Sequence, residues 1–181
     1  MNRREFLEVS AATLLVAGCG GSHDDPVLPE TLRVSRTDTI VADASGTLFR
    51  ARPAVRTISR LDASGAAVWT TGSYGKGPAQ FDYPAELVVD RLGRVLVVDR
   101  GNARVQILDA ASGGYLGQFG SLGTGLGQFR HPRRIAVGND RIYVVDQLND
   151  RIGVFALDGK PLFAIVCASV PCGVNATTRP A

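Results

Sequence analysis

Acidic and amide side chains recur at a fixed spacing in the second half of this 181-residue sequence. Asp99 precedes Asn102 by three residues, and Asp146 precedes Asn149 by the same interval. Such oxygen-bearing side chains could bind a metal ion, but Asp and Asn also bond backbone groups two or three positions on and so stabilise tight turns. Each pair stands in a short connection between apolar runs, and it occurs twice where a catalytic centre would need it once. We therefore favour the turn interpretation and predict no metal site.

An arginine follows each of these pairs by two residues, at Arg104 and Arg151. Phosphate binding is one use of such a side chain, because a guanidinium can donate paired hydrogen bonds to an oxyanion. A buried arginine, however, is tolerated only when it has partners. We therefore expect both arginines to be structural, with a bond back to the aspartate or to a neighbouring repeat.

The sequence offers little for catalysis. Its two histidines are His23 and His131, whereas catalytic zinc usually takes three protein ligands. No Gly-x-Ser-x-Gly elbow is present. The glycine-rich stretches 72–77 and 120–127 are not followed by the helix that a phosphate loop needs. We expect no catalytic residues and no cofactor, and the balance leans against an enzyme.

The elements that position these residues belong to a tandem repeat. Gly72-Ser73 recurs as Gly120-Ser121, and Pro84 recurs as Pro132. An older copy precedes them, in which 40–43 corresponds to 87–90, Arg56 stands roughly where Arg104 does, and 51–54 replaces the Asp-x-x-Asn pair.

Short runs of Val, Ile, Leu and aromatic residues, bounded by Gly, Asp, Asn or Ser, predict four strands in one repeat. They cover 86–90, 94–99, 104–109 and 115–119. Four short strands in a unit of about 40 to 50 residues are typical of a β-propeller blade. Phe81 and Phe129 are expected to wedge between adjacent blades.

The run Phe-x-x-Pro, then Gly-x-hydrophobic-x-Val-x-Asp-x-x-Asn-x-Arg, resembles the NHL repeat, strongly over 72–163 and weakly over 32–71. The resemblance implies an all-β fold, a partial β-propeller of about three four-stranded antiparallel NHL-type blades. We place them at 31–71, 72–119 and 120–166, with an irregular tail over 167–181. Such propellers are generally six-bladed and bind ligands in loops on one face or at the central channel. Some relatives are lyases or hydrolases with a metal there.

The N-terminus has the charged, apolar and small-residue order of a signal peptide, predicted over 1–18. Its apolar run is too short to span a bilayer. Within it, Arg3, Arg4, Phe6 and Leu7 resemble the twin-arginine export motif. Asn2 and Glu8 depart from that motif, so the ordinary Sec route stays open.

Residues 16–19 resemble the lipobox of bacterial lipoproteins, which implies a lipid-carrying Cys19 and a tether over 19–30. We therefore expect an exported protein, lipid-anchored in the bacterial cell envelope and facing the periplasm. Gly20 favours the outer membrane over the inner one. Cys167 and Cys172 then remain, either as a disulfide or as two free thiols.

The net charge of +3 comes largely from scattered arginines. This is not the clustered footprint of a nucleic-acid binder, so we expect no nucleic acid. The expected partners are an unknown protein or small ligand, and the lipid membrane through the N-terminal anchor. The candidate binding residues lie in predicted loops: Tyr74, Lys76, Arg100, Arg130, His131, Arg133 and Gln147.

Three blades leave two uncovered faces. A truncated gene product, a homodimer that completes a six-bladed ring, and docking onto another propeller half are all open. The leading functional hypothesis is an envelope-tethered binding or scaffold module. The alternatives are a metal-dependent lyase- or hydrolase-like enzyme active only in a completed ring, or a non-functional truncated product.

Overall fold

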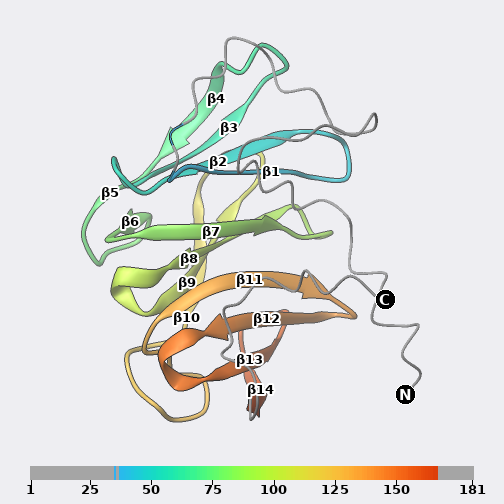
Figure 1. Ribbon diagram of the computed structural model, residues 1–181. Helices are drawn as coiled ribbons and strands as arrows, with labels where there is room; N and C mark the ends of the chain where they lie inside the picture. The colour runs from blue at the N-terminus through green and yellow to red at the C-terminus, as the bar shows by residue number, and fades with distance from the viewer. Residues whose placement is uncertain (1–34, 36, 167–181) are drawn as a thin grey trace, which may run out of the picture.

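The computed structural model describes residue 35 and residues 37–166. Three four-stranded antiparallel sheets are stacked one upon the next (Figure 1). In each sheet the strands follow one another in chain order. This confirms the predicted all-β fold and the partial propeller of about three blades.

Each sheet is a simple meander. The first contains β1 (Thr39–Ala42), β2 (Leu48–Arg52), β3 (Thr57–Leu61) and β4 (Ala67–Thr71). The second contains β7 (Pro84–Val89), β8 (Arg94–Asp99), β9 (Arg104–Asp109) and β10 (Tyr115–Phe119). The third contains β11 (Pro132–Gly138), β12 (Arg141–Asp146), β13 (Arg151–Ala156) and β14 (Pro161–Val166).

Short elements connect these strands. β5 (Ser73–Tyr74) and β6 (Gln80–Phe81) form a two-residue parallel pair within the connection from the first sheet to the second. Two 3₁₀ turns, η2 (Arg100–Asn102) and η3 (Gln147–Asn149), join the second and third strands of the later sheets. No helix in the described part of the chain is both long and apolar enough to cross a membrane.

The hydrophobic core lies between the sheets, because both faces of the middle sheet are apolar. Successive side chains of a strand point to opposite faces. Accordingly Val95 and Val97 of β8 join a first core with the first sheet, while Leu96 and Val98 join a second core with the third sheet. All four are fully buried. The middle sheet is thus the shared wall of both cores.

Phe81 and Phe129 lie where the repeat pattern predicts. Phe81 packs in the first core and Phe129 in the second, and each is at most 1% exposed. The Phe129 ring lies 5.5 Å from that of Phe155. Both residues wedge between adjacent sheets, as predicted.

The register of the first sheet corrects the sequence alignment by one position. Arg52 pairs with Thr57, as Asp99 pairs with Arg104 in the second sheet. Thr57 therefore occupies the position of Arg104, and 52–55 replaces Asp-x-x-Asn. Arg56 instead takes the left-handed conformation of the turn, with φ 58°. The alignment failed there because it matched arginine to arginine, whereas strand pairing follows the backbone.

Candidate functional site

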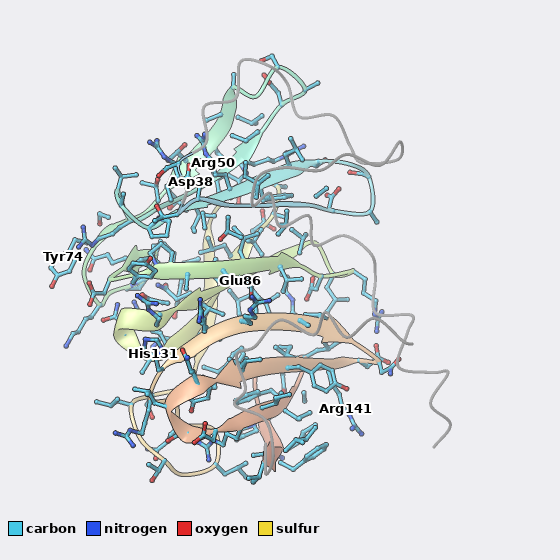
Figure 2. All side chains as sticks on the ribbon, viewed as in Figure 1. Asp38, Arg50, Tyr74, Glu86, His131 and Arg141 are labelled. Carbon is cyan, nitrogen blue, oxygen red and sulfur yellow. The ribbon has the colours of Figure 1, made fainter. Side chains whose placement is uncertain are left out.

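The predicted loop residues gather at one end of the stack, which we call the loop end. It comprises 52–56, 72–83, 100–103, 120–133 and 147–150, and Tyr74 and His131 mark it in Figure 2. The opposite end, the turn end, comprises 43–47, 62–66, 90–93, 110–114, 139–141 and 157–160; Arg141 marks it. Connections from separate repeats meet at the loop end because antiparallel meanders return every second turn to the same side.

Asp99 is the centre of a buried network at the loop end. Its Oδ1 accepts hydrogen bonds from the backbone N–H groups of Asp82 at 3.0 Å and Tyr83 at 3.3 Å. Its Oδ2 accepts from Asn102 Nδ2 at 2.7 Å and from Arg104 Nε at 3.0 Å. The expected turn bond two or three positions on is thus replaced by bonds to backbone 16 and 17 residues earlier.

The rest of the Arg104 guanidinium holds the glycine-rich connection. Nη1 donates to the carbonyl oxygen of Lys76 at 2.7 Å, and Nη2 donates to those of Gly77 at 3.1 Å and Gln80 at 2.8 Å. The Asn102 side chain adds a bond to the Gly75 carbonyl at 2.9 Å. The arginine is therefore bonded both to the aspartate and to the preceding connection.

The third sheet repeats this arrangement. Asp146 accepts from the backbone N–H groups of Arg130 and His131, and the Asn149 side chain bonds the Gly123 carbonyl at 3.0 Å. Arg151 donates to three carbonyl oxygens of the connection 124–128. The six repeat side chains act together as clamps: Asp99, Asn102, Arg104, Asp146, Asn149 and Arg151.

True turn bonds by aspartate occur at the turn end. Asp43, Asp62 and Asp90 each accept backbone N–H groups two and four residues on, and Asp109 accepts one three residues on. Hydrogen bonds from Ser64 and Ser112 lower the pKa of the Asp62 and Asp109 carboxyls. Within the described residues, no group of three His, Cys, Asp or Glu side chains could hold a metal ion.

The first two candidate binding residues lie on the connection before the second sheet. Tyr74 is 69% exposed, and the guanidinium of Arg56 lies 4.8 Å from its ring centroid. Lys76 is exposed beside it. Tyr74 and Lys76 are therefore two exposed side chains of the same connection, and the cation over the Tyr74 ring is that of Arg56.

A contact between the start of each 3₁₀ turn and the residue before the proline recurs in the second and third sheets. The Arg100 guanidinium lies 3.9 Å from the Tyr83 ring centroid, and the Arg100 N–H bonds the Tyr83 carbonyl at 2.9 Å. Gln147 and His131 hold the same positions, with Gln147 N–H bonding the His131 carbonyl at 3.1 Å. The sequence reasoning missed Tyr83. An aromatic ring before the proline in both repeats was the available signal.

The last two candidates are basic. Arg130 and Arg133 are exposed on either side of His131, whose own side chain is half-buried. The candidates thus share one end of the stack without converging on one point. Tyr74 and His131 lie at different levels of it (Figure 2).

Glu86 of β7 is a further charged residue that the sequence did not single out. It is 7% exposed, and its Oε2 accepts the backbone N–H of Ile135 in the third sheet at 2.7 Å. Burial raises the pKa of the Glu86 carboxyl, against the hydrogen bond from Ile135 and the charges of Arg134 and Arg133. At the equivalent place in the first sheet, Thr39 Oγ1 donates to the Ala85 carbonyl at 3.1 Å. One residue position therefore links each sheet to the next.

The remaining predicted residues lie outside the described part of the chain. They are Arg3, Arg4, Phe6, Leu7, Cys19, Cys167 and Cys172. The signal, lipidation and disulfide predictions stay predictions.

Residues 81–108, from the buried Phe81 into β9, match the family model of the NHL repeat. NHL repeat-containing protein 3 of Homo sapiens is 38% identical over 91 residues, which cover 49% of this chain and 25% of the human protein. The same protein of Mus musculus is 39% identical over 83 residues, which cover 45% of this chain and 23% of that protein. The chain spans about a quarter of the length of these curated relatives.

Solved structures with the same fold are β-propellers. A streptogramin B lyase gives a TM-score of 0.55 at 20% identity, covering 72% of this chain and 40% of that one. The virginiamycin B lyase from Staphylococcus aureus gives 0.58 at 16% identity, covering 77% and 44%. The repeat match and these folds together support an NHL-type β-propeller, and the described residues form three four-stranded blades.

Proposed function

We propose that this protein is an envelope-tethered binding module whose loop end takes an acidic partner. The observation that carries the proposal is the gathering of basic and aromatic side chains from all three blades at one end. The basic ones are Arg52, Arg56, Lys76, Arg100, Arg130 and Arg133.

The acidic groups of the same end offset this charge only in part. Asp99 and Asp146 are buried and bonded within the clamps. Asp82 lies 4.0 Å from the Arg56 guanidinium. The Asp82 side chain is 42% exposed, and Asp150 is exposed at the same end. A surface with excess positive charge attracts anionic partners at a rate and affinity that fall with salt.

Exposed rings add a second kind of contact. Tyr74 is 69% exposed beneath the Arg56 guanidinium, and tyrosine and arginine are enriched in the energetically dominant parts of protein interfaces. Acidic protein segments or anionic small ligands would both be recognised by this combination. The tether supports the proposal through the lipobox-like 16–19 segment, which would hold the module at a membrane surface.

Binding of poly-L-glutamate to the purified chain tests the proposal. A triple variant, Lys76→Ala, Arg130→Ala and Arg133→Ala, removes three charges from the loop end. The matched control, Arg91→Ala, Arg141→Ala and Lys160→Ala, removes three from the turn end. We expect the first variant to lose most of the salt-sensitive binding and the control to keep it. Equal losses would show that only net charge matters and would overturn the proposal.

A lyase-like activity is the second candidate. It draws on the fold that this chain has in common with the streptogramin B and virginiamycin B lyases. At 16% and 20% identity that likeness concerns the fold alone. Elemental analysis for bound zinc or calcium, together with a streptogramin-cleavage assay, tests this candidate directly.

A further inference from the structure

We propose that the outer face of the third blade docks against the first blade of a second copy of this chain, closing a six-bladed ring. The outer face is the side of the third sheet that points away from the second core. It carries Arg134, Tyr143, Val145, Ile152, Phe163 and Ile165. The same positions of the blade before it are covered by the third blade.

The middle blade shows what this face is built to meet. Ile165 pairs with Ile152 as Phe119 pairs with Val105, so Ile165 holds the position of Phe119. Phe119 is 9% exposed in the second core, whereas Ile165 is 42% exposed and its neighbour Phe163 43% exposed. Burying such apolar surface is the main driving force of association. The outer face therefore has the composition of a covered blade face.

The charges fit a first blade as the occupant. Arg134 holds the position of Glu86, since each follows the bulge of its inner strand. Glu86 reaches across its junction into the field of Arg133 and Arg134. In the proposed junction Arg134 would reach the residues equivalent to these, which are Thr39 and Asp38. The Asp38 carboxylate is 3% exposed and lies 3.9 Å from Arg52, so Arg134 would share this carboxylate with Arg52.

A second exchange points the same way. Phe49 and Val97 belong to the first core, and Leu96 and Val144, at the next repeat's equivalent positions, belong to the second. The next pair in this series is Tyr143 with Arg50. In the proposed junction the apolar pair of the two cores is thus replaced by the ring of Tyr143 and the guanidinium of Arg50. These two groups can form a favourable cation–π contact. Figure 2 places Arg50 beside Asp38 on the first sheet.

Two copies bring six described blades together, three from each copy. The contact is head-to-tail, and it forms a closed ring when the rotation between copies closes and an open filament when it does not. A closed pair is therefore a specific expectation.

Light scattering on the purified full chain in mild detergent tests the proposal. We expect twice the mass of a single chain for the wild type. The double variant Phe163→Lys, Ile165→Lys should have the single-chain mass with an unchanged circular dichroism spectrum. The control Leu92→Lys changes a 53% exposed leucine at the turn end and should stay paired. A single-chain mass for the wild type, a longer open series, or a paired double variant would each overturn the proposal.

A charge variant gives an independent reading. Arg134→Glu should raise the dissociation constant of the two-copy assembly roughly tenfold or more. The new carboxylate would face Asp38, which has the same charge. Arg91→Glu, at the turn end, should leave that constant unchanged. An Arg134→Glu protein that pairs as tightly as the wild type would contradict the proposed orientation.

Discussion

The guanidinium of Arg104 lies 3.0 Å from the carboxylate of Asp99, and the two side chains are 6% and 0% exposed. In the third blade the corresponding pair, Arg151 and Asp146, is 3.8 Å apart and the arginine is 14% exposed. The first blade has neither member, because Arg52 and Thr57 hold those positions. One unpaired buried charge costs far more free energy than the absence of the whole ion pair. A blade that lacks the aspartate is therefore expected to lack the arginine as well.

Asp99→Ala should therefore destabilise the protein by about 3–5 kcal/mol, because it leaves Arg104 buried without its charge partner. Urea unfolding followed by fluorescence measures this loss. The control is Asp140→Ala, which breaks an exposed ion pair with Arg91 and should cost at most about 1 kcal/mol. Similar losses in the two variants would contradict the clamp.

Glycine is required at the junction between the first two blades. Gly72 has φ +119°, and a Cβ there would lie 2.3 Å from the carbonyl oxygen of Arg56. Because that oxygen belongs to the backbone, it cannot turn aside. Gly72→Ala should reduce the free energy of unfolding well beyond the about 1–2 kcal/mol of left-handed strain alone.

Gly93→Ala provides the matched comparison. Gly93 has φ +71°, but a Cβ at this position would meet no atom within 4 Å. It should show only the strain of about 1–2 kcal/mol. Thermal unfolding of both variants gives the difference, and an equal effect would mean that the close approach at Gly72 is relieved elsewhere.

Glu86 should make stability depend on pH in the opposite sense to a typical carboxylate. Burial raises the pKa of its carboxyl above 4.5, so the folded protein holds the proton to a higher pH than the unfolded chain does. The contribution of protonated Glu86 to the free energy of unfolding is fully present below pH 4.5. It is lost as the pH rises through the pKa of the folded protein. Glu86→Gln should flatten this decline in unfolding experiments that run upward from below pH 4.5. Parallel profiles would remove Glu86 as the cause.

Cys19 is expected to carry the membrane anchor. Two or three acyl chains hold a protein firmly, at about 0.8 kcal/mol for each buried CH₂ group. In bacterial cells fed an alkyne-bearing fatty acid, the wild-type chain should take up the label and sediment with membranes. Cys19→Ala should do neither, while Cys172→Ala should behave as the wild type. A labelled Cys19→Ala protein would refute the lipobox interpretation.

The strands were predictable because each is a short apolar run closed by Gly, Asp or Asn. β8, β9 and β10 have the predicted bounds, while β7 begins two residues early and ends one early. The structural roles of Asp99 and Arg104 were also predictable from their recurrence. The bond from Arg104 back to Asp99 was among the expected partners. The backbone partners were not predictable, because these lie 16 to 28 residues away and depend on how the connection folds back.

The candidate surface was predictable only as a set of loop residues. That Arg56 covers Tyr74 and Arg100 covers Tyr83 depends on contacts between separate connections. No spacing in the sequence encodes these contacts. Glu86 was missed because a single acidic residue in an apolar strand reads as solvent-facing until the next sheet is in place.

The clamps have a consequence for how the chain is made. The carbonyl of Gln80 receives its bond from Arg104, which lies 24 residues further along. A growing polypeptide therefore completes the hydrogen bonds between a connection and the repeat that follows it only when the third strand of that repeat has left the ribosome. Since the second and third repeats each carry the clamp for the connection that precedes them, an ancestral gene could lengthen or shorten by whole units and leave the earlier clamps intact.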